Sequence, residues 1–467
     1  MHPTHARIGE PALSPASRAT RHPPRPAGLL VALLLTACTA ADPTDSTGLA
    51  DSEPCGTDSG TGCAPQSARV DLYQPVFSDP TVITNPLFPI AELESVVFLG
   101  LVDGLPFRTE TTLLPTTRTI DWNGTPVETL ESQYMAFSDG RIEEIATDWY
   151  AQDDAGAVWY FGEDVADYNA DGVVYTHDGT WRVGVDGAPV TMIMPADPQV
   201  GDVYLAENVA PIAWEEVTVT EVDAEADGPA GTVTGVMVGS ELHMDGTRQE
   251  KVFAPGYGEF STGSVATDDL EALALAVPTD RLSEPAPAEL TTMASELARV
   301  FDAAGEGDWP TAAAGEAAGS AAWEAYRAGG VPPLIDAELP ALLAALDAAV
   351  AAEDGAQTRQ LSITVARLVY DLRLRYESRL AIDAVRLDLW CAQVAVDLDA
   401  GDYGSLRGDA ASASLVWNRV AHAYEGAAAA EIVSLLADLS GAAAAEDGAG
   451  VEAAALALRG QLAKQGW

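Results

Sequence analysis

Aromatic and β-branched residues are concentrated in residues 148–204, in short runs that turn-forming residues separate. The turns fall at Asp153–Gly156, Asn169–Gly172 and Asp178–Thr180. Short runs divided by Asp, Asn and Gly are typical of a β-meander. Large aromatic side chains supply the burial that a thin sheet needs, and here they are Trp149, Tyr150, Trp159, Tyr160, Phe161, Tyr168, Tyr175 and Trp181. We therefore expect this stretch to form the core of a β domain.

The β pattern continues on both sides of this stretch, and we place the β domain at residues 70–277. Turn signals recur along it, and no strong helical period intervenes. The strand candidates are Ser95–Val102, Pro126–Tyr134, Ile142–Tyr150, Ala157–Phe161, Trp214–Val222, Gly231–Val238 and Glu250–Ala254. This pattern predicts an antiparallel sheet, either a sandwich or a half-barrel.

A second, helical domain is predicted for residues 288–467, after a Pro-containing linker at 278–287. Its composition is rich in Ala and Leu, which favours helices. Gly305, Gly355, Gly401 and Gly448 recur with spacings of 50, 46 and 47 residues, and each is interpreted as ending a long helix. A period of this length fits one helical hairpin per unit. We expect about eight helices in a bundle or short stack of hairpins, so the fold class is α+β with two domains.

The N-terminus carries an export signal, placed at residues 1–37. Arg18, Arg21 and Arg25 precede the apolar run Leu29–Leu35, which is too short to span a bilayer. The sequence Leu-Thr-Ala-Cys that ends at Cys38 resembles the bacterial lipobox, in which the Cys is acylated. An ordinary signal peptide with a chance Cys is the alternative. We expect Cys38 to anchor the chain to the membrane, facing the periplasm or the cell surface at the outer membrane, and residues 38–69 to form a flexible acidic tether.

Charge and cysteine content agree with an exported protein. The formal net charge is −47, so we exclude nucleic acid and anionic lipid surfaces as ligands. Cys55 and Cys63 lie eight positions apart and are expected to form a disulfide, although two free thiols are the alternative. Cys391 falls in an apolar helical pattern and is expected to be a buried core residue.

Several short motifs, taken in order, resemble a widespread family of uncharacterised secreted and lipid-anchored bacterial proteins. They begin with NPLFP at 85–89 and continue with DWYAQD at 148–153, VWYFGE at 158–163 and GVDGA at 184–188. The motifs MPA at 194–196, QVGD at 199–202 and APGYG at 254–258 complete the set, which covers residues 80–262. The second half also looks like helical regions of bacterial envelope proteins. The resemblance implies a compact β domain and supplies no activity or catalytic residue.

One loop has the ligand spacing of a calcium site. Asp167, Asn169 and Asp171 stand at positions 1, 3 and 5, Gly172 provides the turn, and Asp178 stands at position 12. No helices flank the loop, position 12 is Asp and not Glu, and Asn-Ala-Asp-Gly forms a good hairpin turn by itself. We favour the plain turn and keep calcium as the alternative.

Polar residues on the otherwise apolar helices form a second candidate site. The functional interpretation is a pocket within the bundle for a metal or a small ligand, formed by Arg367, Asp371, Asp388, Asn418 and His422. The alternative is a set of interhelical ion pairs that fix the register of the helices. Arg367 and Asp371 are four residues apart and are expected to pair on one helix.

These observations favour a non-enzymatic, lipid-anchored envelope protein that acts as a binding or structural module, with an envelope protein or a small molecule as partner. Two alternatives remain. One is a hydrolase whose carboxylates lie in the cleft between the domains, and the other is an envelope lipoprotein that handles Ca²⁺ or a transition metal. The enzyme alternative predicts two carboxyl groups with displaced pKa values in one concave site.

Overall fold

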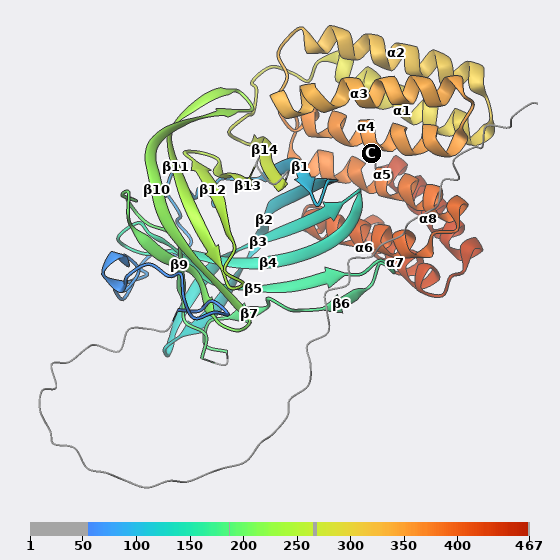
Figure 1. Ribbon diagram of the computed structural model, residues 1–467. Helices are drawn as coiled ribbons and strands as arrows, with labels where there is room; N and C mark the ends of the chain where they lie inside the picture. Colours follow the sequence, from blue (N-terminus) through green and yellow to red (C-terminus); the bar gives the residue numbers. More distant parts are fainter. Residues whose placement is uncertain (1–54, 186, 265–268, 466–467) are drawn as a thin grey trace, which may run out of the picture. The chain divides into compact units, whose positions relative to one another are not determined.

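A large antiparallel sheet is followed by eight helices in the part of the chain that the computed structural model describes, residues 55–185, 187–264 and 269–465 (Figure 1). The α+β architecture predicted from the sequence is confirmed. The signal sequence and Cys38 lie outside the described residues. Residues 52–467 form one compact unit, in which the sheet and the helices share an interface.

The sheet has fourteen strands that follow one another as an antiparallel meander. Their order is β6-β5-β4-β3-β2-β1-β14-β13-β12-β11-β10-β9, and β7 and β8 both pair with β5. The bounds are β1 Ser95–Val102, β2 Leu105–Trp122, β3 Thr125–Ser138, β4 Arg141–Gln152, β5 Val158–Tyr168, β6 Val174–Thr176, β7 Trp181–Arg182, β8 Thr191–Met194, β9 Val203–Val209, β10 Ala213–Gly228, β11 Gly231–His243, β12 Arg248–Ala254, β13 Gly258–Ser264 and β14 Asp269–Val277.

The two ends of the sheet approach each other. The hydroxyl of Thr191 on β8 donates a hydrogen bond to the carbonyl of Ala206 on β9, at 2.7 Å. The indole Nε1 of Trp181 on β7 donates to a carboxylate oxygen of Glu207 on β9, at 3.1 Å. Because β7 and β8 belong to one end and β9 to the other, these bonds curl the sheet into a half-barrel.

The segment before the sheet is ordered from Cys55 onward, which corrects the prediction of a flexible tether as far as residue 69. Cys55 and Cys63 form the disulfide that their spacing predicts, with an S–S distance of 2.01 Å. The disulfide packs against an apolar cluster that includes Trp214 of β10 and Leu242 of β11. The backbone N–H of Ala64 donates to a carboxylate oxygen of Glu216 at 2.8 Å. The burial of these side chains is what fixes the segment on the sheet.

The eight helices form four consecutive hairpins. Their bounds are α1 Ala288–Glu306, α2 Trp309–Arg327, α3 Pro333–Ala351, α4 Gly355–Arg373, α5 Arg379–Ala400, α6 Tyr403–Val420, α7 Ala427–Ala444 and α8 Gly448–Lys464. Within each hairpin an Asp side chain caps the second helix by accepting a backbone N–H two or three residues into it. These caps are Asp308, Asp354, Asp402 and Asp447.

The glycine repeat was therefore partly misinterpreted. Only Gly401 ends a helix in the left-handed conformation, with φ 69°. Gly305 lies inside α1, where Gly307 provides the left-handed end, and Gly355 and Gly448 each begin a helix. The repeat of about 47 residues therefore comes from the capping Asp before the second helix of each hairpin. The glycines are near these Asp residues but do not share one role.

The helices cover the outer face of the sheet. Val97 and Leu275 pack with α1–α5, and Met135, Phe137 and Ile142 pack with α5–α8. By length and composition alone, α7 is the one described helix that could cross a membrane. It packs through Ile432, Leu436 and Leu439, which are buried in the helical region.

Candidate ligand-binding site

The inner face of the half-barrel surrounds a cavity of about 520 Å³, which we call the sheet cavity. Residues from ten strands, β1–β5 and β10–β14, line it. Side chains alternate along each strand between the face that lines the cavity and the outer face of the sheet. On β2, Thr109 and Thr111 face the cavity, whereas Arg108 and Glu110, which alternate with them, pair with helical residues. The strand pattern itself therefore creates two chemically different faces.

One part of the sheet cavity is lined by carboxyl groups without basic partners. These carboxyl groups are Glu144 and Asp148 on β4, Glu163 on β5, Glu259 on β13 and Glu271 on β14. None forms an ion pair with an Arg, Lys or His of the described residues. Burying several carboxylates without ion-pair partners is costly, because hydrogen bonds such as those from Ser132 and Tyr160 to Asp148 replace only part of the lost hydration. We call these five residues the acidic wall.

The pKa values of the acidic wall show this cost. Burial, with a smaller contribution from Asp167, raises the pKa of Glu144 to about 7. Burial and the charge of Glu259 raise the pKa of Glu271 to about 7. Burial raises the pKa of Asp148 to about 6, although hydrogen bonds from Tyr160 and Ser132 oppose the shift. Near pH 7 the carboxyl groups of Glu144 and Glu271 are therefore about half protonated, and a bound cation favours their ionised form.

The sheet cavity also has an apolar wall. Phe88, Ile90 and Leu93 come from the loop before β1, Phe98 comes from β1, and Tyr257 precedes β13. All except Phe88 are buried by more than nine-tenths. A cavity of this volume with an apolar wall opposite a few polar groups is typical of small-molecule sites.

A second set of charges in the sheet cavity is balanced. His243 Nδ1 lies 3.2 Å from Glu215 Oε1, and Lys251 Nζ lies 3.2 Å from Glu241 Oε2. Burial alone would raise the pKa of Glu215, but His243 and Lys251 outweigh it and lower that pKa to about 2. Burial raises the pKa of Glu241 to about 8 despite the charge of Lys251. Two acids here face two bases, unlike the acidic wall.

Ligand atoms of Glu215, Glu241 and His243 all lie within 4.8 Å of one another. Both nitrogens of His243 already have partners, since Gln249 Nε2 lies 2.6 Å from His243 Nε2. A metal would have to displace Gln249 and compete with Lys251, so this geometry favours an ion-pair network over a metal site.

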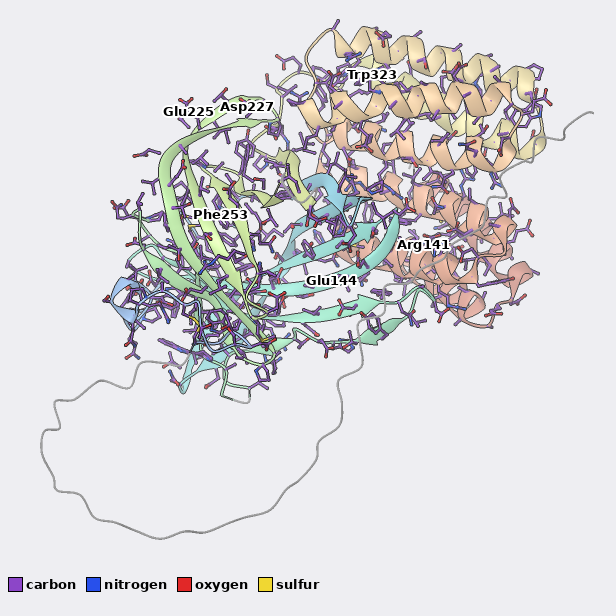
Figure 2. All side chains as sticks on the ribbon, in the orientation of Figure 1. Arg141, Glu144, Glu225, Asp227, Phe253 and Trp323 are labelled. Carbon is purple, nitrogen blue, oxygen red and sulfur yellow. A yellow bond between two sulfur atoms is a disulfide. The ribbon has the colours of Figure 1, made fainter. Side chains whose placement is uncertain are left out.

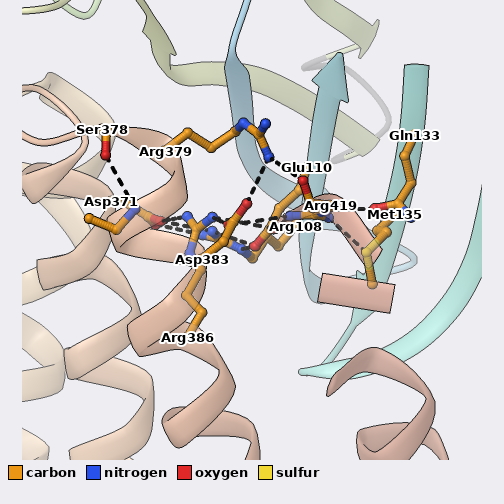
Figure 3. A network of polar contacts seen from close by, with 11 residues as sticks. Arg108, Glu110, Gln133, Met135, Asp371, Ser378, Arg379, Asp383, Arg386 and Arg419 are labelled. Carbon is orange, nitrogen blue, oxygen red and sulfur yellow. Dashed lines mark hydrogen bonds and ion pairs between the residues drawn. The ribbon is translucent and has the colours of Figure 1, made fainter. Parts of the chain in front are cut away.

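On the outer face, a buried ion network joins the sheet to the helices (Figure 3). Asp371 of α4 accepts from Arg108 of β2 and from Arg386 of α5, at 2.6 to 2.8 Å. Arg419 of α6 donates to Glu110 of β2 at 2.8 Å. Burial opposes ionisation of Glu110, but the neighbouring charges of Arg386, Arg108 and Arg419 outweigh it and hold its pKa well below the usual value. The network is internally paired and fixes the helices on the sheet.

The five residues of the predicted bundle pocket do not come together. Asp371 belongs to the buried network, and Asp388 pairs with Arg459 at 2.8 Å. Asn418 and His422 are exposed. Arg367 does not pair with Asp371, because Asp371 is occupied by Arg108 and Arg386. The guanidinium of Arg367 instead stacks on the ring of Trp390, 4.9 Å from its centroid.

The predicted calcium loop forms the β5–β6 hairpin. The side-chain oxygen of Asn169 accepts the backbone N–H groups of Asp171 and Val173, as expected of the plain turn. The carbonyl of Asp171 accepts from Arg407 of α6 at 2.8 Å. Asp167, Asp171 and Asp178 do not form a group of three close carboxylate ligands among the described residues. Calcium binding here stays a prediction.

Sequence reasoning missed the acidic wall, although a signal for it was present. Glu144, Ala146, Asp148 and Tyr150 alternate along β4 and all line the cavity. Acidic residues on the face opposite the half-buried Ile145 and the buried Trp149 could be taken for a solvated surface. Only the curvature of the sheet shows that this face is turned inward.

Comparison of the chain with protein-family models, with curated proteins and with solved structures finds no match in any of the three. The resemblance to secreted and lipid-anchored bacterial proteins therefore stays a prediction.

Proposed function

We propose that the chain is a binding protein of the bacterial cell envelope that holds a small organic cation in the sheet cavity. The observation that supports this function best is the acidic wall, five carboxyl groups on one cavity surface without basic partners among the described residues. A cationic ligand adds positive charge beside these carboxyl groups and favours their ionised form, which burial disfavours.

The shape and the second wall of the cavity favour an organic cation over a bare metal ion. A metal ion needs only a few close oxygen ligands, whereas this cavity has a volume of about 520 Å³. The apolar wall offers Phe98 and Tyr257 to the carbon skeleton of a ligand. A flexible polyamine, with ammonium groups separated by methylene segments, combines both features. The location at the envelope rests on the signal sequence and Cys38.

A thermal-shift panel tests this function. The probes are spermidine, putrescine, the neutral 1,8-octanediol, Ca²⁺ and Zn²⁺, each added to the mature chain at pH 8. We expect the melting temperature to rise with both amines, more with spermidine, and not with the diol. A rise with Ca²⁺ or Zn²⁺ and none with the amines rejects the organic-cation assignment and favours the metal-handling alternative.

The panel is repeated on matched variants. Glu144 and Glu271 are replaced by Gln, which keeps size and hydrogen bonding and removes the charge. The control is Glu225→Gln, an exposed residue near the β10–β11 turn, far along the sheet from Glu144 (Figure 2). The amine-induced shift should be lost in the double variant and kept in the control.

A further inference from the structure

A second cavity, of about 900 Å³, lies between the outer face of the sheet and the helices. Its lining comes from β1–β4 with the β3–β4 turn on one side and from α3–α6 on the other. We call it the sheet–helix cavity. It shares no lining residue with the sheet cavity. The buried ion network borders it through Arg108, so its walls are fixed by the same contacts that hold the helices in place.

Arg367 of α4 lines this cavity without a carboxylate in direct contact, although the charges of Glu110, Asp371 and Asp409 act on it from farther away. Its guanidinium makes no hydrogen bond or ion pair with the described residues, and its one specific contact is the ring of Trp390. Burial lowers the pKa of Arg367 to about 10, and the nearby charge of Arg108 adds to that shift. Arg108, Arg386 and Arg419 are buried, whereas Arg367 is half-buried, and each of those three has a carboxylate partner within 2.8 Å. Arg367 therefore presents five N–H donors to the cavity without an acceptor.

Two carboxyl groups complete the polar end of the cavity. Asp397 of α5 and Asp409 of α6 hydrogen-bond to each other, and Asp409 is buried, with an exposed fraction of 4%. Burial and the adjacent Asp397 raise the pKa of Asp409 well above its usual value. Gln393 beside them adds an amide group.

The remainder of the lining is mainly apolar. Leucine and phenylalanine side chains from the strands and from α3 and α4 form it, namely Leu99, Leu101, Phe107, Phe137, Leu334, Leu342, Leu361 and Leu368. The cavity thus joins a polar end, where Arg367 has no hydrogen-bond partner among the described residues, to a long apolar surface. An amphiphile with a small anionic head and a hydrocarbon tail matches both parts.

We propose that the sheet–helix cavity binds a fatty acid, with its carboxylate paired to Arg367 and its acyl chain along the leucine and phenylalanine side chains. The guanidinium fork and the carboxylate match in geometry, and the apolar environment strengthens their attraction. This site is separate from the proposed cation site, so the chain would carry two ligands of opposite charge in two cavities.

The test compares dodecanoate with dodecanol on the delipidated mature chain by calorimetry. The two probes share the hydrocarbon tail and differ in the anionic head. We expect dodecanoate to bind at least tenfold more tightly than dodecanol to the wild-type chain. Equal affinities, or no binding of dodecanoate, would overturn the proposal.

The Arg367→Met variant, which keeps an apolar stem of similar length, should lose at least tenfold in dodecanoate affinity and nothing in dodecanol affinity. The matched control is Arg373→Met on the same helix, because Arg373 pairs with Glu377 and does not line the cavity. Unchanged dodecanoate affinity in Arg367→Met also overturns the proposal. If that variant does not fold, the dodecanoate affinity of Arg367→Lys is measured in its place. The comparison of dodecanoate with dodecanol on the wild-type chain then also tests the proposal. Spermidine binding measured on the same samples separates failure at this site from failure of the cation site.

Discussion

Arg108 on β2 and Asp371 on α4 lie 263 positions apart in the sequence and form a bidentate pair, with N–O distances of 2.6 and 2.8 Å. Asp371 has an exposed fraction of 0%. Removing one member of a buried, hydrogen-bonded ion pair leaves the other charge uncompensated in a medium that hydrates it poorly. The stability of the sheet–helix interface therefore depends on this pair.

Replacing Asp371 by Asn should lower the free energy of unfolding by about 3–5 kcal/mol. The control is Arg281→Met, since the pair of Arg281 with Glu94 is partly solvent-exposed and should contribute about 0–1 kcal/mol. Urea denaturation followed by both tryptophan fluorescence and far-ultraviolet circular dichroism measures the two variants. Equal losses in Asp371→Asn and Arg281→Met would contradict the assigned role of the network.

The stability of the ligand-free protein should fall as the pH rises from about 5 to about 8. Burial raises the pKa of Glu144 and Glu271 to about 7 in the folded state, from 4.5. The folded protein thus keeps protons that the unfolded chain releases, and this contribution, full below about pH 4, is lost above about pH 7. A shift of this size corresponds to about 3 kcal/mol for each carboxyl group.

The double variant Glu144→Gln/Glu271→Gln should be more stable than the wild-type chain at pH 8 and similar to it at pH 5, because Gln stays neutral throughout. Chemical denaturation at four pH values gives the two curves, with Glu225→Gln as the control that should follow the wild type. Parallel curves for the double variant and the wild type would show that these carboxyl groups titrate at their ordinary pKa.

The disulfide between Cys55 and Cys63 should contribute about 2–4 kcal/mol to stability. It packs against Trp214 and Leu242, and so it fixes the N-terminal segment on the outer strands β10 and β11. A reductant should lower the melting temperature of the wild-type chain and leave that of the Cys55→Ser/Cys63→Ser variant unchanged. An equal effect of the reductant on both proteins would assign the change to another group.

Acylation of Cys38 is predicted from the sequence alone, since Cys38 lies outside the described residues. Metabolic labelling with palmitate should label the wild-type protein and leave the Cys38→Ser variant unlabelled. The variant should also move from the membrane fraction to the soluble fraction. An unlabelled wild-type protein in the cytosolic fraction would remove the basis for placing the chain at the envelope.

The sequence was sufficient for what depends on local pattern. The strand Ser95–Val102, the boundary of the helical region after residue 287 and the number of helical hairpins all follow from periodicity and turn residues. The disulfide followed from the spacing of two cysteines in a chain predicted to be exported. In each case the determining residues are close together in the sequence.

What the sequence could not supply depends on long-range pairing. Asp371 was expected to pair with Arg367 one helical turn away, but Arg108 of a distant strand occupies it, which leaves Arg367 to the sheet–helix cavity. The acidic wall likewise combines β4, β5, β13 and β14, which only the closure of the meander through the pairing of β1 with β14 brings onto one surface. No local rule indicates that either group faces a cavity.

The most direct test of the cation site is a calorimetric titration of spermidine at pH 8 into three proteins: the wild type, Glu144→Gln/Glu271→Gln and Glu225→Gln. Loss of two charge-assisted contacts, each of about 1.5–3 kcal/mol, predicts an affinity at least one hundredfold lower in the double variant and an unchanged affinity in the control. Equal spermidine affinity in all three proteins, or no binding by the wild type, would contradict the assignment of the sheet cavity to an organic cation.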